Sequence, residues 1–248
     1  MIDLLVELHQ GLDRLGPGDD ESTLRALGLC RGLPAKPSIL DIGCGTGAQT
    51  LTLARHTEGA ITATDLVPSM LAALNERAAA AGLASRIATR VADMGSLPFT
   101  DGSFDLLWSE GAVYILGFDV GLTAWRRLLV PGGYLVVSEA SWFRPDPPEE
   151  LAAFWAEGYP GMRSVEANVA AAKARGWEVV DTFLLPDASW TEGYYAGLRE
   201  RLPAFRQRHA GDEEALGVVA MTEREMALFE AYSEHYGYAF YVLRTDQR

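Results

Sequence analysis

Ile39-Leu40-Asp41-Ile42-Gly43-Cys44-Gly45-Thr46-Gly47 is the stretch of sequence that decides the fold of this chain. A short apolar run over 37–42 predicts a strand, and helical spacing of apolar residues follows over 46–56. Glycines between a strand and a helix allow a tight turn and let a ligand approach the backbone closely. The stretch therefore predicts a ligand-binding loop at the end of a buried strand.

The glycine spacing leaves the kind of ligand open. The loop reads G-x-G-x-G, whereas a dinucleotide fingerprint places its third glycine one position later, where this chain has Ala48. That fingerprint tolerates alanine there, so the loop alone does not exclude NAD. The neighbouring motifs must decide between the two kinds of ligand.

Strands and helices alternate along the chain on the C-terminal side of the loop. Apolar runs predict strands over 60–65, 86–92, 104–108, 134–139, 177–185 and 238–244, and helical spacing predicts helices over 68–81, 119–129 and 165–175. With the strand over 37–42 this makes seven strands. Repeated strand–helix units form doubly wound sheets, so the predicted fold class is α/β with a mostly parallel seven-stranded sheet.

The composition argues against several classes of protein. The 248 residues carry a formal net charge of −13, which disfavours a protein that grips nucleic-acid phosphates. No apolar run is long enough for a membrane span, and the N-terminal stretch lacks the basic start of a signal peptide, so we expect a cytoplasmic protein. Cys30 and Cys44 are the two cysteines, and their spacing matches no metal site or disulfide framework.

Five signals in order resemble the class I S-adenosylmethionine-dependent methyltransferases, in their small-molecule branch. They are the glycine loop, Asp65-Leu66, Asp93-Met94, the strand over 104–108 and the turn over 129–133. In this resemblance Asp65 binds the ribose hydroxyls, Asp93 the adenine amino group and Met94 the face of the ring. It implies S-adenosyl-L-methionine as cofactor, an antiparallel last strand, and cofactor contacts from Asp41, Gly43, Gly45, Thr46, Gly47, Asp65, Leu66, Asp93, Met94 and Glu110.

The resemblance also organises the chain, which we expect to be a single methyltransferase domain over 1–248. Its parts are an N-terminal helical segment over 1–35, a donor-binding core over 36–140, and insertions over 143–161 and 189–236. Ligands bind beyond the carboxyl ends of strands in open α/β sheets, so we expect the insertions to form a lid there. The segment before the first strand either folds over the donor, with His9, Gln10 and the turn over 16–20, or forms a peripheral helix.

Glu110 and Tyr114 are the candidate catalytic residues because they follow the fourth strand at the edge of the predicted pocket. A methyl group on a sulfonium is already activated, so alignment and exclusion of water carry much of the rate of an in-line displacement. The acceptor supplies an oxygen, nitrogen or carbon nucleophile, no metal is required, and a general base is needed only where the acceptor loses a proton. An ion-paired or capping role for Glu110 stays equally open.

Aromatic residues at the exit of the fifth strand and in the longer insertion are the candidate substrate contacts. They are Trp142, Trp190, Tyr194 and Tyr195. Aromatic faces attract cationic or flat molecules, so these side chains could line a cage around the acceptor. The alternative is that they form the core of an added helical layer.

Two other functions remain open at this point. An NAD-dependent oxidoreductase fits Ala48, but Lys36 and Lys173 are the only lysines and neither belongs to a Tyr-x-x-x-Lys pair. A non-catalytic protein that binds the donor would keep the same motifs. For partners we expect a small-molecule acceptor, neither nucleic acid nor membrane, and a monomer or homodimer.

Overall fold

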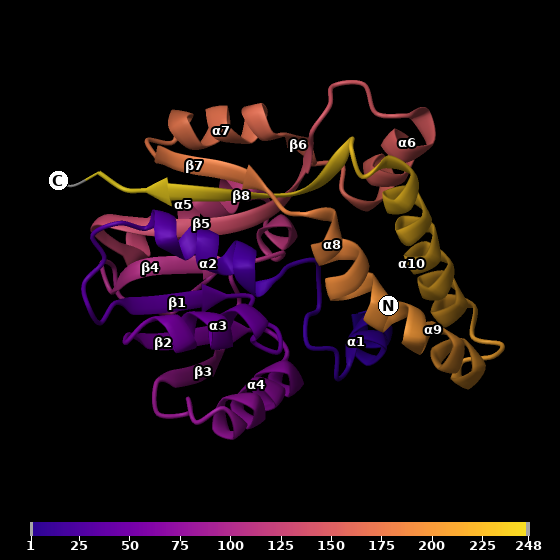
Figure 1. Ribbon diagram of the computed structural model, residues 1–248, viewed down its shortest axis with the longest axis horizontal. Coiled ribbons are helices and arrows are strands. Elements are labelled where there is room, and N and C mark those ends of the chain that lie inside the picture. The colour runs from indigo at the N-terminus through magenta and orange to yellow at the C-terminus, as the bar shows by residue number, and fades with distance from the viewer. Residues whose placement is uncertain (1, 247–248) are drawn as a thin grey trace.

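The computed structural model describes residues 2–246 and places a single twisted sheet at the centre of the molecule (Figure 1). The strand order is β3-β2-β1-β4-β5-β8-β7, and the short β6 pairs with β5. The strands are β1 Ser38–Ile42, β2 Ala60–Asp65, β3 Ile87–Val91, β4 Phe104–Ser109, β5 Leu129–Trp142, β6 Arg163–Ser164, β7 Glu178–Leu184 and β8 Tyr236–Arg244. Residues 1 and 247–248 of the predicted domain lie outside the described residues.

The sheet is mixed, as predicted. Strands β1 to β5 pair in parallel, whereas β8 runs antiparallel to both β5 and β7. The two-residue β6 is an eighth strand that the sequence pattern did not predict, since two residues carry no periodic signal. Strand β5 is also longer than the predicted 134–139, because Trp142 pairs with Tyr236 at its far end.

Helices cover both faces of the sheet and form a separate layer beyond one end of it (Figure 1). The helices are α1 Ile2–His9, α2 Asp20–Leu29, α3 Ala48–His56, α4 Pro68–Ala80, η1 Val113–Ile115, α5 Phe118–Trp125, η2 Arg126–Leu128, α6 Glu149–Gly158, α7 Val165–Ala174, α8 Asp187–Trp190, η3 Thr191–Tyr195, α9 Ala196–Arg208 and α10 Glu213–Tyr232. Of these, η3 is a π-helical turn. Within residues 2–246 we find no helix that combines the length and the apolar character needed to cross a membrane.

The core has two parts, one on each face of the sheet. Along β4, Leu106 and Trp108 pack on one side while Leu107 packs on the other, because successive strand side chains point to opposite faces. All three side chains are fully buried. A strand that is apolar on both faces is typical of a parallel sheet covered on both sides, and this explains the unbroken apolar run over 104–108.

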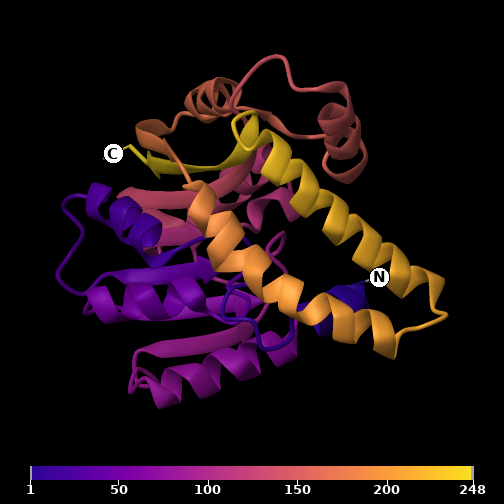
Figure 2. The ribbon, with the colours of Figure 1, turned by 45° about the vertical axis from the view of Figure 1, so that its right-hand side comes forward.

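The segment from α8 to α10, residues 187–232, connects β7 to β8, and we call it the helical insertion. Figure 2 shows its two long helices leaving from the same end of the sheet, with α1 against them. Because β8 begins opposite the C-terminal end of β5, the helical insertion starts and finishes near the carboxyl ends of the parallel strands. It therefore stands over the edge of the sheet where the glycine loop lies.

Candidate active site

The glycine loop joins β1 to α3 and takes its shape from three left-handed backbone conformations. Gly43, Gly45 and Gly47 have φ angles of 71°, 54° and 81°. A Cβ atom on Gly47 would lie 2.1 Å from Cδ1 of the buried Leu74. Only glycine fits such a position without strain. The loop therefore leaves its backbone open to a close ligand, as its spacing predicts.

Asp41 holds the loop from below and has no exposed surface. Its carboxyl accepts a hydrogen bond of 2.5 Å from Thr50 Oγ1 and one of 3.3 Å from Gln49 Nε2, both at the start of α3. Burial raises the pKa of Asp41 to about 7, and the two hydrogen bonds oppose that rise. This predicted cofactor residue therefore fixes the loop to α3, and a direct contact with cofactor stays a prediction.

Asp65 ends β2 beside the loop. Its Oδ2 accepts from the Gly45 N–H at 2.9 Å, and its Oδ1 accepts from the Val67 N–H at 2.9 Å. An ionised carboxylate offers about four lone-pair positions, so each oxygen keeps capacity for one more donor. The next side chain, Leu66, is 67% exposed. Asp65 therefore offers free hydrogen-bond acceptor positions on both carboxylate oxygens, and Leu66 offers an exposed apolar side chain next to them.

Asp93 and Met94 follow β3 at the same edge of the sheet. Asp93 is exposed, and its Oδ1 accepts from the Gly95 N–H at 2.8 Å, which leaves Oδ2 without a protein partner among the described residues. The Met94 carbonyl accepts from Trp125 Nε1 at 2.8 Å, and its methyl group lies 3.3 Å from the position of a Cβ on Gly43. The ends of three adjacent strands thus gather the predicted donor-binding side chains.

The N-terminal segment over 10–19 lies on the glycine loop. A Cβ on Gly45 would meet Leu15 Cδ1 at 2.7 Å. Arg77 Nη1 donates to the carbonyl oxygens of Asp13 at 2.9 Å and of Thr46 at 3.0 Å. The helix that follows is capped by Asp19, which accepts from the Ser22 N–H. These contacts match the alternative in which the segment folds over the loop rather than standing apart.

Glu110 binds the N-terminal segment instead of facing an open cavity. Its side chain is 5% exposed and accepts from Arg14 Nη1 at 3.3 Å, from Thr23 Oγ1 at 2.7 Å and from Trp108 Nε1 at 2.8 Å. Burial raises the pKa of Glu110, while Arg14 opposes the rise. The geometry matches the ion-paired alternative, and a catalytic role for Glu110 stays a prediction.

Tyr114 and Tyr194 are more accessible. Tyr114 is 44% exposed, and its ring lies edge-on to Tyr159 with the ring centres 5.9 Å apart. Tyr194 is part-buried, and its hydroxyl lies 2.8 Å from His9 Nε2. Since His9 Nδ1 must donate to the Leu5 carbonyl at 2.7 Å, Nε2 of the neutral ring accepts the hydrogen bond that the Tyr194 hydroxyl donates. Because both rings keep accessible surface, Tyr114 and Tyr194 can each contact a ligand.

Trp190 and Tyr195 form the interior of the helical insertion. Trp190 is 1% exposed and stacks on Phe229 at 4.5 Å between ring centres, and Tyr195 has no exposed surface. Tyr195 donates to Glu225 Oε1 at 2.8 Å. This packing matches the interpretation in which the two residues form the core of an added helical layer. Direct contact of Trp190 and Tyr195 with a methyl acceptor stays a prediction.

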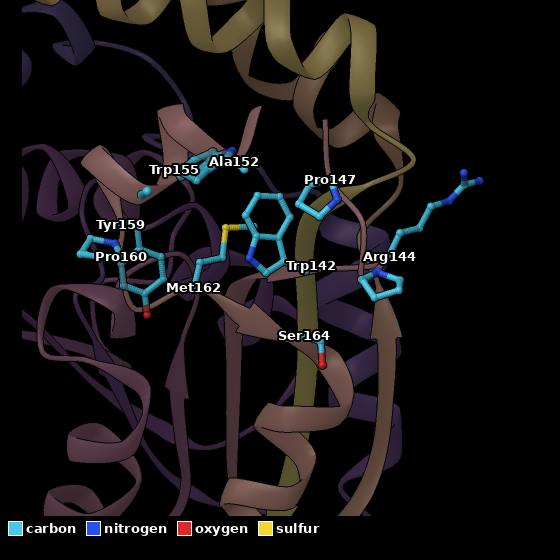
Figure 3. A pocket seen from close by; sticks show the side chains of 11 residues that line it. Trp142, Arg144, Pro147, Ala152, Trp155, Tyr159, Pro160, Met162 and Ser164 are labelled. Atoms are coloured by element: carbon cyan, nitrogen blue, oxygen red, sulfur yellow. The ribbon is translucent and has the colours of Figure 1, made fainter. Parts of the chain in front are cut away.

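Trp142 lines a cavity of about 430 Å³ on the α6 side of the molecule. Figure 3 shows its indole beside Met162, with Tyr159 at one end of the cavity and Arg144 pointing outward. Tyr159 is also the residue that packs on Tyr114, so the cavity adjoins the surface that carries the accessible tyrosines. Trp142 can therefore contact a ligand in this cavity, whereas Tyr194 is not among the residues that line it.

Sequence reasoning missed Tyr238 and Glu225. The Tyr238 ring covers Gly111, where an added Cβ would meet Tyr238 Cε2 at 3.2 Å. Glu225 falls on the buried stripe of α10 formed by Val218, Thr222 and Phe229. A carboxylate at core spacing on an amphipathic helix is the signal that could have singled it out.

The glycine loop, Asp65 at the end of β2 and Asp93 after β3 lie together as the resemblance to class I S-adenosylmethionine-dependent methyltransferases implies. Residues 39–133 match a family model described as a methyltransferase domain. The chain is 38% identical over 117 residues to an uncharacterised methyltransferase YodH of Bacillus subtilis, covering 47% of this chain and 48% of that protein. The chain spans less than half the length of the curated relatives that match first.

Solved structures match the fold over nearly the whole chain. A methyltransferase from Geobacter sulfurreducens, in complex with S-adenosylhomocysteine, superposes with a TM-score of 0.82 at 23% identity and covers 97% of both chains. The [4+2]-cyclase SpnF superposes with a TM-score of 0.78 at 23% identity, over 99% of this chain and 92% of that one. The resemblance and the fold class predicted from the sequence are both confirmed.

Proposed function

We propose that the protein transfers a methyl group from S-adenosylmethionine to a small-molecule acceptor. The observation that carries this proposal is the gathering of the glycine loop, Asp65 and Asp93 at one edge of three adjacent strands. The Asp65 and Asp93 carboxylates keep acceptor positions that no donor among the described residues uses. The glycines of the loop leave backbone that no side chain of their own covers. The methyltransferase domain match over 39–133 covers all of them.

The side chains present suit this donor. Asp65 has lone pairs free for two ribose hydroxyls, and the free Asp93 oxygen can accept from an adenine amino group. Leu66 and Met94 offer apolar surface to a flat ring. The glycine loop has no side chain at the positions where the rest of the donor would meet backbone.

The donor supplies an activated methyl carbon, whose bond to sulfur breaks with its electron pair left on sulfur as the acceptor forms its new bond. The protein's part is alignment and exclusion of water. Leu15 and the Arg77 contacts hold the N-terminal segment over the loop, which keeps solvent away from it. Tyr114 is the better placed of the two catalytic candidates, because the Glu110 carboxylate already has three protein partners.

Calorimetry with S-adenosylhomocysteine tests donor binding. We expect micromolar affinity for the native protein and a loss of at least tenfold in Asp65→Ala, since a charge-assisted hydrogen bond contributes about 1.5–3 kcal/mol. Asp101→Ala is the control, because Asp101 is exposed and, within residues 2–246, its ion-pair partner is Arg127 at the surface. Undetectable binding to the native protein, or preferential binding of NADH, would overturn the proposal.

Binding of the donor without transfer is the second candidate function. It is favoured by one observation, the close fold match to a [4+2]-cyclase, since one fold can serve several activities. Methyl-labelled S-adenosylmethionine, incubated with a panel of small alcohols, amines, carboxylic acids and enols, separates the two. Label transfer to any acceptor supports methylation, and tight donor binding with no transfer supports the second candidate.

The cytoplasmic location and the monomer or homodimer predicted from the sequence also belong to this proposal. Both cysteines are free and buried, as suits a reducing compartment. Light scattering coupled to gel filtration measures the oligomeric state directly.

A further inference from the structure

A single stretch of chain, residues 142–164, surrounds the cavity of about 430 Å³ on the α6 side of the molecule. It runs from the last residue of β5 through α6 to the end of β6, and all the residues that line the cavity belong to it. The volume lies within the usual range of small-molecule sites, roughly 300–1,000 Å³. We call it the α6 cavity, and none of the side chains proposed to hold the donor lines it.

Both ends of this stretch are fixed to the sheet. Trp142 in β5 pairs in parallel with Ser164 in β6, so the stretch leaves and rejoins the sheet at neighbouring points. Between them, Leu151 of α6 has no exposed surface and Met162 is 8% exposed, and both pack in the core on this face of the sheet. Because the walls of the cavity are held in place by these contacts, a ligand can bind without the free-energy cost of ordering them.

The two indoles in the wall of the cavity lack a stacked neighbour. Figure 3 shows the Trp142 indole among the lining side chains, with the Met162 sulfur beside it. Trp142 is part-buried, and Tyr236 meets its ring edge-on with the ring centres 6.2 Å apart. Trp155 is also part-buried and meets Phe154 and Tyr236 edge-on. Within residues 2–246 no aromatic ring stacks face to face on either indole, and a flat ligand would supply that contact.

The rest of the lining is nearly free of charge. Of the described residues that line the cavity only Arg144 is charged, and it is exposed, pairs with Glu234 at 2.7 Å and points outward (Figure 3). The Ser164 hydroxyl oxygen accepts from the Ala167 N–H as the cap of α7. Most other lining residues are prolines and alanines. A charged molecule would lose its hydration here without gaining an unpaired ionic partner, so the lining favours an uncharged ligand.

We propose that the α6 cavity binds an uncharged, flat aromatic molecule that stacks on the Trp142 indole. This goes beyond the proposed function, which assigns no ligand to the cavity. Burial of apolar surface stabilises any apolar molecule of suitable size, and stacking on an indole adds a preference for an aromatic ring over a saturated one.

Ligand-observed NMR at pH 7 with probes of one carbon skeleton tests both preferences. The uncharged aromatic probe 2-naphthol should bind several-fold more tightly than decahydro-2-naphthol, which has the same skeleton without an aromatic face. The anion 2-naphthoate and the cation 2-naphthylmethylammonium should each bind at least tenfold more weakly than 2-naphthol. Because probes of both signs are used, the net charge of the protein cannot produce this result.

A variant that fills the cavity locates the bound probe. Ala152→Leu adds a larger side chain to the lining and should weaken 2-naphthol binding at least tenfold. Ala153→Leu is the matched control, since Ala153 is the next residue of α6, is exposed and does not line the cavity. Both residues are good helix formers, so α6 is kept in both variants. Native-like unfolding temperatures would show that the loss of binding is local.

A second variant tests the stacking contact itself. Trp142→Leu should abolish the preference for 2-naphthol over decahydro-2-naphthol, whereas Trp142→Phe, which keeps an aromatic face, should retain part of it. A loss of packing alone would weaken binding of the two probes equally. An unchanged preference in Trp142→Leu would overturn the proposal.

The remaining outcomes separate this proposal from the proposed function. Displacement of 2-naphthol by S-adenosylhomocysteine, or unchanged binding in Ala152→Leu, would place the probe elsewhere and overturn the α6 cavity as its site. An affinity for 2-naphthol that falls as the protein concentration rises would show that a second copy of the chain covers the cavity, with the same consequence. Binding of 2-naphthol as expected, without any binding of S-adenosylhomocysteine, would overturn the proposed function and leave the α6 cavity standing.

Discussion

Asp41 shows how one residue of the donor loop couples the fold to pH. The residue is fully buried and has no ion-pair partner in the part of the chain that the structure describes, and its neighbours Glu110 and Asp65 both raise its pKa further. In the unfolded chain its carboxyl ionises near pH 4, whereas in the folded protein it keeps its proton to about pH 7. The folded state therefore binds one more proton than the unfolded state between these values.

Asp41→Asn should remove this dependence. A carboxyl whose pKa is raised on folding stabilises the protein fully below its unfolded pKa, and this stabilisation is lost as the pH rises through the folded pKa. The free energy of unfolding of the native protein should thus fall, relative to the variant, by up to about 1.4 kcal/mol per pH unit. Urea denaturation at steps from pH 5.5 to 8 measures this difference in the free energy of unfolding. If the free energies of the native protein and the variant change in parallel with pH, the raised pKa of Asp41 is contradicted.

At the scale of elements, the N-terminal segment is joined to the sheet by a small set of charged contacts. Arg14 bridges Asp20 at 2.8 Å and Glu110 at 3.3 Å, and Asp19 binds Ser189 at the start of the helical insertion. The Gly18 N–H donates to the Ser189 carbonyl as well. The segment therefore contacts the glycine loop, Glu110 just after β4, and the helical insertion at once.

Arg14→Gln should release the segment. The change leaves the Glu110 carboxylate, whose side chain is 5% exposed, without its cation, and an uncompensated buried charge is strongly destabilising. Hydrogen exchange over residues 10–20 should rise at least tenfold, while Arg206→Gln, which breaks a surface pair with Glu223, should leave it unchanged. The double variant Arg14→Gln, Glu110→Gln should recover part of the protection. An unchanged exchange rate in Arg14→Gln would show that the segment is held by Leu15 and Arg77 instead.

At the scale of the whole molecule, donor binding should stabilise the fold. A ligand at a concentration of one hundred times its Kd stabilises the native state by about 2.7 kcal/mol. For a chain of 248 residues this corresponds to a rise in Tm of about 5 to 10 °C. Differential scanning calorimetry with S-adenosylhomocysteine measures the shift, and Asp65→Ala at the same ligand concentration should show a much smaller one.

The donor half of the site could be predicted from the sequence because its parts are local. Asp65 and Asp93 each end or follow a strand, so recognising β2 and β3 also locates them at the edge of the sheet. The contacts within the helical insertion have no such signal. Tyr195 and Glu225 lie 30 residues apart in the sequence, and only the packing of the helical insertion brings the hydroxyl to the carboxylate.

The same limit explains the aromatic candidates. Trp190 and Tyr195 belong to a stretch with two adjacent tyrosines, and composition alone does not distinguish a ligand cage from a packed interior. The π-helical turn over 191–195 gives Tyr194 and Tyr195 different surroundings, since Tyr195 faces Glu225 while Tyr194 faces His9. No periodicity of the sequence predicts that turn.

The connection of the helical insertion to the sheet bears on how such enzymes diversify. Strands β7 and β8 remain paired up to Leu184 and Ala239, and Leu185 still donates to the Tyr238 carbonyl, so the chain departs and returns at neighbouring points. Residues 186–235 can therefore be exchanged as one continuous block with only two junctions. Under the proposed function, we expect recombination at those junctions to alter the choice of acceptor while the donor loop stays intact, and a chimera with the block of a relative tests this.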